Sequence, residues 1–224
     1  MKIIARISTD LPSKFGLPRQ SGLVEGIVGR IVFEREYRNP EAFRGLEDFS
    51  HIWLLWQFSE AVRDGWSPTV RPPMLGGNKR VGVFATRSPF RPNSIGLSSV
   101  RLERVEYTAD EGPVLYVSGC DLMNGTPIYD IKPYLAYTDS HPDAVCGFTQ
   151  SLPDRTLTVE VNDELLSRIP EDKRRTLTAI LSQDPRPSYQ NDPERIYGFA
   201  FAGFEVRFSV CDGVLTVVSI DIAS

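Results

Sequence analysis

The sequence has little of the material from which metal centres and histidine-dependent active sites are built. Only two of its 224 residues are histidines and three are cysteines, so a zinc site or a Ser-His-Asp hydrolase has few residues to draw on. Cys120, Cys146 and Cys211 are widely spaced and form no CxxC pair, which is typical of buried thiols in a reducing compartment. These absences predict a cytoplasmic protein without a structural metal.

Long apolar runs and the common nucleotide-binding loops are also missing. The longest strongly apolar run covers residues 52–56, which is far too short to span a membrane. The first ten residues show no signal-peptide pattern. No GxGxxG motif follows a predicted strand and no Walker-type loop occurs, which argues against a Rossmann or P-loop nucleotide site. We therefore expect no membrane partner and a different kind of ligand site.

Charge is unevenly distributed along the chain. The net charge of −4 argues against a generally basic nucleic-acid-binding protein. Residues 71–104, however, contain seven basic residues and one acid, Glu103, so this window carries +6 and the rest of the chain −10. A basic zone on an acidic body suits a polyanion or a phosphate-bearing ligand. Surface arginines paired with acids from elsewhere would explain the window equally well, and both interpretations stay open here.

The first two thirds of the sequence read as a series of strands. Runs rich in β-branched and aromatic residues occur at 22–33, 51–58, 81–85, 95–107 and 114–117. Val100, Leu102 and Val105 share one apolar face, and the step from 102 to 105 indicates a bulge. A short helix is predicted within 40–46. Dense strands without crossover helices predict an antiparallel β-barrel or a sandwich.

The pattern changes after residue 146. Apolar residues at helical spacing predict helices over 163–169 and 171–182, and residues 195–222 alternate around Cys211-Asp212-Gly213, which indicates a hairpin. We expect a mainly β protein with an antiparallel β domain at 1–147, a barrel or a sandwich, and a smaller α+β domain at 148–224.

A polar elbow interrupts two strands between residues 86 and 95. Pro89 and Pro92 lack backbone donors and fix φ, so the elbow is not a central strand. The prolines should hold four polar side chains in fixed directions and so lower the ordering cost of a bound ligand. These side chains are Arg87, Ser88, Arg91 and Asn93.

Three further polar segments are candidate ligand sites. In 16–22, Arg19 and Gln20 offer fork-shaped and amide donors. In 121–139, a tight turn at Asn124-Gly125 precedes alternating polar residues at 130, 132 and 134, which can orient a ligand or move a proton. A cross-strand ion pair between Asp130 and Lys132 explains that spacing as well. In 184–189, Arg186 lies between two prolines and suits either a phosphate contact or a simple turn.

Taken together, these segments resemble the TsaA/TrmO family of S-adenosylmethionine-dependent tRNA methyltransferases. The resemblance is carried by long motifs in the family's order and covers nearly the whole chain. The motifs are FGLPRQSGL, LEDFSHIWLLW, RPPMLGGNKRVGVFATRSPFRPNSIGLSSVRL, DLMNGTPIYDIKPYLAYTDS and DPRPSY.

The resemblance implies a β-barrel that binds S-adenosyl-L-methionine near a homodimer interface. It implies methylation of N6 of threonylcarbamoyl-adenosine, the base just 3′ of the tRNA anticodon, with neither DNA nor a membrane as partner. The cofactor contacts it implies are Pro18, Arg19, Gln20, Ser59, Glu60, Arg87, Leu97, Asp121, Leu122, Met123 and Asn124. The chain departs from the family at Ser59-Glu60, where a histidine and a polar residue are common, at Asn124, where Asp is usual, and at Ala136, where Pro is usual.

The reaction needs few catalytic groups, because S-adenosylmethionine is already a strong electrophile and the enzyme mainly aligns the N6 nitrogen with the methyl group. That nitrogen is a poor nucleophile until it loses its proton, so a general base is expected. We expect Asp130 to be the base, with Asp121 as the second candidate. Tyr134 or Lys132 would orient the ureido carbonyl, and Arg91 or Arg186, with Asn93 nearby, would meet the threonyl carboxylate or an RNA phosphate.

Two other functions are compatible with parts of this pattern. A non-catalytic RNA-binding barrel would need only the basic zone, and an S-adenosylmethionine-sensing protein would need only the cofactor site. An enzyme needs a donor pocket beside a basic RNA-binding surface.

Overall fold

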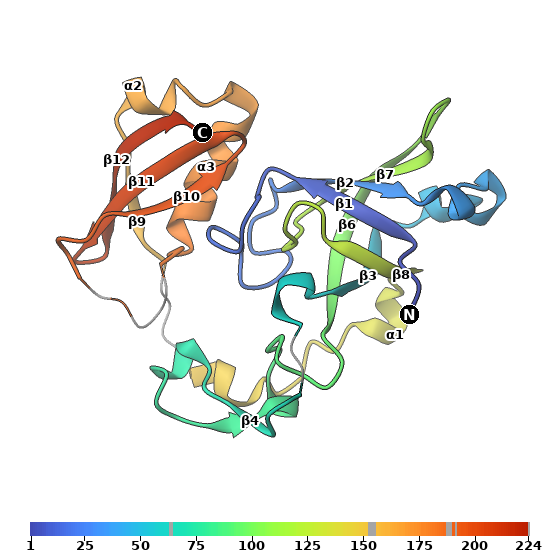
Figure 1. Cartoon of the computed structure of the whole chain (residues 1–224), viewed down its shortest axis with the longest axis horizontal. Helices are drawn as coiled ribbons and strands as arrows, with labels where there is room; N and C mark the ends of the chain where they lie inside the picture. Colours follow the sequence, from blue (N-terminus) through green and yellow to red (C-terminus); the bar gives the residue numbers. More distant parts are fainter. Residues whose placement is uncertain (63–64, 152–155, 187–189, 191, 224) are drawn as a thin grey trace.

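A computed structural model describes residues 1–62, 65–151, 156–186, 190 and 192–223 (Figure 1). The expected domain boundary at 147/148 lies close to residues 152–155, which are outside this description, and so are Pro187, Ser188 and Tyr189 of the DPRPSY segment. Within the described residues, no helix is long and apolar enough to cross a membrane.

Six strands close into a barrel in which every neighbouring pair is antiparallel. This confirms the mainly β, antiparallel barrel expected from the sequence. Around the barrel the order is β1 (Ala5–Thr9), β2 (Val28–Phe33), β7 (Gly112–Ser118), β6 (Ile95–Thr108), β3 (His51–Gln57) and β8 (Pro127–Pro133).

Alternation of side chains explains the barrel core. In β3, the buried residues Ile52, Leu54 and Trp56 point inward, and the residues between them lie at the surface. In β6, the pairing with β7 shifts between Leu102 and Arg104, which confirms the bulge that the sequence indicated.

Some connecting segments differ from the sequence prediction. The strand expected over 22–33 begins only at Val28, because Gly22 adopts a φ of 81° and its N–H bonds to the Gly119 carbonyl. The short helix expected within 40–46 is present as the 3₁₀ helix η2 (Pro40–Phe43), and two more 3₁₀ helices flank it, η1 (Arg35–Tyr37) and η3 (Leu46–Asp48).

The strand expected over 81–85 is also only partly formed. It contributes β5 (Val81–Gly82), which pairs with β4 (Thr69–Val70), and then turns into η6 (Val83–Ala85). The turn forms because the Thr86 N–H and hydroxyl both donate to the Val83 carbonyl. Other short turns and helices are η4 (Ser59–Ala61), η5 (Pro73–Leu75), α1 (Ala136–Asp139) and η7 (Gly147–Ser151).

The C-terminal unit is a four-stranded sheet with helices, as expected. Its strands are β10 (Tyr197–Phe201), β11 (Phe204–Cys211), β12 (Val214–Ile222) and β9 (Thr158–Glu160), in that order, and β9 runs parallel to β12. Its helices are α2 (Asp163–Leu166) and α3 (Glu171–Ser182). Asp212 and Gly213 both have positive φ, of 47° and 80°, which confirms the hairpin between β11 and β12.

The C-terminal unit packs directly on the N-terminal segments of the chain. In α3, Lys173 forms an ion pair with Asp10, and the Thr176 hydroxyl donates to the Gly26 carbonyl at 3.1 Å. The buried apolar residues of both units belong to one continuous cluster. The position of the domain boundary stays a prediction.

Candidate functional site

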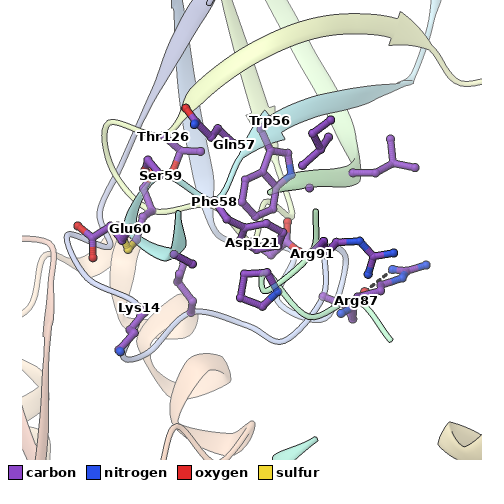
Figure 2. Close-up of a pocket in the computed structure, with 18 of the residues that line it drawn as sticks. Lys14, Trp56, Gln57, Phe58, Ser59, Glu60, Arg87, Arg91, Asp121 and Thr126 are labelled. Atoms are coloured by element: carbon purple, nitrogen blue, oxygen red, sulfur yellow. Dashed lines mark hydrogen bonds between the residues drawn. The ribbon is translucent and has the colours of Figure 1, made fainter. Parts of the chain in front are cut away.

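A cavity of about 660 Å³ lies at one end of the barrel (Figure 2). This volume is within the range of about 300–1,000 Å³ found for small-molecule sites. Four parts of the chain enclose it: the loop before β2, the end of β3 with η4, the polar elbow with the start of β6, and the turn before β8. The lining includes Lys14, Leu17, Pro18, Arg19, Gln20, Trp53, Trp56, Gln57, Phe58, Ser59, Glu60, Ala61, Thr86, Arg87, Pro89, Phe90, Arg91, Ile95, Gly96, Leu97, Asp121, Met123 and Thr126.

Asp121 is the acidic group buried most deeply in this cavity. Its Oδ1 accepts a hydrogen bond from the Ser98 hydroxyl at 2.6 Å, and the Ser98 oxygen accepts one from the Trp56 indole N–H at 3.0 Å. Burial raises the pKa of Asp121, because desolvation outweighs the opposing effects of the Ser98 hydrogen bond and the Arg87 charge. The site therefore holds a carboxylate that is a stronger base than an exposed aspartate.

Gly96 allows the Trp56 ring to form a wall of the cavity. Trp56 and Gly96 are directly opposite each other on β3 and β6. A Cβ atom at position 96 would lie 2.6 Å from Cδ2 of the Trp56 ring and closer still to Cε2 and Cζ2. The ring also contacts Phe58, with 4.3 Å between the ring centroids. Because residue 96 has no side chain, the Trp56 ring can pack against it and form one wall of the cavity.

Basic side chains from two loops surround the cavity. Arg87 donates to the side-chain oxygen of Gln20, which links the elbow to the loop before β2. Arg91 donates through Nη1 to the carbonyls of Thr86, at 2.6 Å, and Val83, at 3.3 Å. Arg91 thus stabilises the conformation of the elbow through hydrogen bonds to backbone carbonyls in and before it. Figure 2 shows Arg87 and Arg91 on one side of Asp121, with Glu60 and Lys14 on the other.

Most residues expected to bind the cofactor are brought together here. Two of the eleven do not line the cavity. Leu122 is fully buried in the core, and Asn124 accepts a hydrogen bond from the Thr9 N–H at 3.2 Å and so holds its own turn. The nine that do are Pro18, Arg19, Gln20, Ser59, Glu60, Arg87, Leu97, Asp121 and Met123.

Asp130 and Lys132 lie outside the lining of the cavity. They form an ion pair with 3.1 Å between Oδ2 and Nζ, and both side chains are about half exposed. The ion pair is thus present, but it forms within β8 and not across two strands as expected. Strand register nevertheless places Asp130 opposite Leu55, and Leu55 opposite the cavity residue Leu97. Because neighbouring strands are about 4.8 Å apart, the backbone of Asp130 lies about 10 Å from that of Leu97.

Tyr134, Asn93 and Arg186 also lie outside the lining. The Tyr134 ring packs against Trp53, with 5.5 Å between centroids. The exposed Asn93 accepts a hydrogen bond from the Ile95 N–H through its carbonyl. The Arg186 side chain is only 10% exposed and makes two hydrogen bonds to Asp184, at 2.8 and 3.1 Å. Its geometry is that of a buried ion pair at the end of α3.

A second cavity, of about 380 Å³, lies between the loop before β2 and the end of α3. Its lining includes Arg186 and Asp184 on one side. On the other side it shares Lys14, Leu17, Pro18 and Arg19 with the first cavity. One loop therefore separates two cavities. In the part of the chain that the structure describes, no group of three or more His, Cys, Asp or Glu side chains could hold a metal ion.

Sequence reasoning did not single out Trp56, Ser98 and Gly96. Inward alternation in β6 places Gly96, Ser98 and Val100 on one face, so a polar residue inside an apolar strand was a detectable signal. The strand pairing that joins Ser98 to Trp56 was not visible in the sequence.

Comparison with known proteins places these features in a family. The family model described as "tRNA-methyltransferase O N-terminal domain" matches residues 6–140, and the "TrmO C-terminal domain" model matches residues 154–223. The chain is 42% identical to "tRNA (adenine(37)-N6)-methyltransferase" of Escherichia coli, over 97% of this chain and 96% of that protein. It is 39% identical to "Putative S-adenosylmethionine-dependent methyltransferase RcsF" of Pseudomonas aeruginosa, over 92% and 90%. A crystal structure of TrmO from Pseudomonas aeruginosa superposes with a TM-score of 0.78 at 31% identity, covering 98% of this chain and 96% of that one.

Proposed function

The chain belongs to the tRNA-methyltransferase O (TrmO) family, and on that premise we propose that it is an S-adenosylmethionine-dependent methyltransferase acting on N6 of adenine-37 in tRNA. More specifically, the substrate is the threonylcarbamoyl-modified base. The observation that carries the proposal is the half-buried Asp121 carboxylate, hydrogen-bonded to Ser98, in a cavity lined by aromatic and basic side chains.

The side chains of the cavity suit S-adenosylmethionine. Trp56, Phe58 and Leu97 offer flat and apolar walls for an adenine ring. Arg19 and Arg87 offer donors for the carboxylate of the methionine part. Glu60 offers a negative charge for the ammonium group. We therefore assign the donor to this cavity, with Ser59-Glu60 retained as contacts.

We assign the general base to Asp121. When bound, S-adenosylmethionine supplies an electrophilic methyl group. Asp121 accepts the proton that leaves N6, and a raised pKa makes it a better acceptor. The Trp56–Ser98 hydrogen-bond chain holds the carboxylate in one orientation. Asp130, which the sequence favoured, is paired with Lys132 on the outer face, and its place near Leu97 suits a contact to the approaching RNA. Tyr134, beside Trp53, belongs to the same outer surface.

Substrate contacts follow from the exposed polar groups beside the cavity. We propose that Asn93 and the half-buried Arg91 contact the RNA next to the target base, because both belong to the elbow that borders the cavity. Arg186 is buried against Asp184, and we propose that it mainly shapes the wall of the second cavity. The family resemblance further suggests a homodimer in the cytoplasm.

The proposal is tested with tRNA from a strain that lacks the gene. Mass spectrometry of the nucleosides should show threonylcarbamoyl-adenosine without its N6-methyl group, and the wild-type gene should restore it. An unchanged methylated pool would refute the assignment. Calorimetry with S-adenosylmethionine separates the other two functions: a purely RNA-binding barrel would not bind the donor, whereas a sensor would bind it and leave tRNA unmethylated.

Two matched variants test the choice of base in purified protein. Asp121→Asn should lower kcat by about 10²- to 10⁴-fold, and Asp130→Asn should retain most of the activity. The reverse pattern would move the base to Asp130. Asp143→Asn, at an exposed position, controls for the loss of a carboxylate elsewhere.

A further inference from the structure

Residues 65–92 form an arm that extends from the barrel around β4 and β5, toward the bottom of Figure 1. Only one residue of this arm, Val83, is buried. A segment of this length that buries a single side chain has almost no core of its own. Its exposed side chains are therefore available to a partner.

Two aromatic rings lie together on the arm surface. Trp66 is 53% exposed and Phe84 is 71% exposed. Their ring centroids are 6.0 Å apart, with an angle of 30° between the planes. Paired aromatic rings of this size usually bury each other's faces in a core. Here both rings are largely exposed to solvent instead.

The arm is also strongly basic. Residues 65–92 include five cations and neither Asp nor Glu; the cations are Arg71, Lys79, Arg80, Arg87 and Arg91. The Arg91 guanidinium lies 5.8 Å from the centroid of the Phe84 ring, so one cation lies directly beside the aromatic pair. A partner that contacts this surface should carry negative charge and flat rings together.

The same arm leads into the donor cavity. Thr86, Arg87 and Phe90, which follow Phe84 within six residues, line that cavity. A nucleotide that enters the cavity from this side must therefore have neighbours close to the aromatic pair. Single-stranded nucleic acid binds to surfaces of this kind, in which aromatic rings stack on bases and cations follow the phosphates.

We propose that Trp66 and Phe84 form a stacking platform for an unpaired base of the RNA substrate next to the methylated one, and that the three arm cations outside the cavity lining, Arg71, Lys79 and Arg80, contact its phosphates. The inference rests on the proposed function, since it assigns the arm to the same tRNA. It adds an RNA-contact site outside the residues that line the donor cavity.

The test measures binding of an unmethylated anticodon stem-loop RNA to the full-length protein. Trp66→Ala and Phe84→Ala should each weaken RNA binding by about fivefold to a hundredfold, with donor affinity unchanged. Trp66→Phe keeps a stacking ring and should stay within about twofold of wild type. Tyr107→Ala removes an aromatic ring of similar exposure, 49%, from the β6–β7 end of the barrel, and should have no effect.

A second measurement tests stacking directly. The RNA carries 2-aminopurine beside the target position, and its fluorescence should fall on binding to wild type and to Trp66→Phe, but much less with Phe84→Ala. Removal of Lys79 or Arg80 should reduce the slope of log affinity against log salt by about one for each residue.

Three results would overturn the platform while leaving the enzyme intact. One is full RNA affinity in both alanine variants, and another is 2-aminopurine fluorescence that does not respond. The third is a change of oligomeric state in the alanine variants by sedimentation, which would assign the arm to a second copy of the chain. Wild-type protein that never methylates tRNA would instead refute the proposed function itself.

Discussion

Gly96→Ala tests whether the cavity depends on the position of the Trp56 ring. The added methyl group would lie 2.6 Å or less from three atoms of that ring, and overpacking of this kind costs about 1–3 kcal/mol. Movement of the ring also breaks its hydrogen bond to Ser98, which adds about 0.5–1.5 kcal/mol. We therefore expect the free energy of unfolding to fall by about 3 kcal/mol, which lowers Tm by about 6–12 °C in a chain of this size.

The same substitution should damage donor binding. Displacement of the Trp56 ring removes an aromatic wall and leaves the Asp121 carboxylate with a misplaced Ser98 partner. Calorimetry should show at least a tenfold loss of affinity for S-adenosylmethionine, on the order of 1.4 kcal/mol or more. Differential scanning calorimetry measures the loss of stability on the same samples.

Two controls make this prediction specific. Gly82→Ala adds a methyl group where no atom lies within 4 Å and φ is −58°, so it should change stability by less than about 0.5 kcal/mol. In a Trp56→Leu background, Gly96→Ala should cost much less than in wild type, because the clashing ring is absent. Unchanged Tm and donor affinity in Gly96→Ala, or an equal cost in both backgrounds, would refute the argument.

Further predictions concern three charged and polar residues. Burial raises the pKa of Asp121, so stability is lost as pH rises from the pKa of an unfolded aspartate to the pKa of Asp121 in the fold, and the loss is complete above both. Asp121→Asn should therefore raise Tm at neutral pH, and the gain should disappear at a pH below the pKa of an unfolded aspartate. In wild type, kcat should fall as Asp121 becomes protonated on acidification, a dependence that a pH–rate profile of the variant should lack. Arg186→Ala leaves Asp184 buried without its partner and should cost about 3–5 kcal/mol in a urea titration, with part of the loss recovered when Asp184→Ala is added. Thr176→Val removes the hydrogen bond to Gly26 and should cost about 1 kcal/mol by the same assay.

Local patterns were sufficient to predict much of the fold. The helix over Glu171–Ser182 and the hairpin at Asp212-Gly213 were predicted because their signals lie within a few residues. The strand expected over 81–85 was wrong beyond Gly82, because the Thr86 N–H and hydroxyl both donate to the Val83 carbonyl and close a turn there. A side-chain hydrogen bond to the backbone of this kind does not show in the apolar pattern of the sequence.

The candidate site was also predicted from the sequence only in part. Motif resemblance pointed to Arg87 and Asp121, and the structure brings both into one cavity. It could not tell the environments of Asp121 and Asp130 apart, because the two residues are of the same type. Only the three-dimensional arrangement shows that Asp121 is half-buried and bonded to Ser98, whereas Asp130 forms an ion pair with Lys132 outside the cavity lining.

The basic arm has a consequence for the rate at which the protein meets RNA. Residues 65–92 carry +5 and the whole chain carries −4, so the remainder carries −9. Such a separation gives the molecule a large electric dipole. In the field of a polyanion the protein rotates so that the arm leads and the acidic body trails, which raises the fraction of collisions that begin in a productive orientation. The association rate constant should therefore fall steeply with ionic strength.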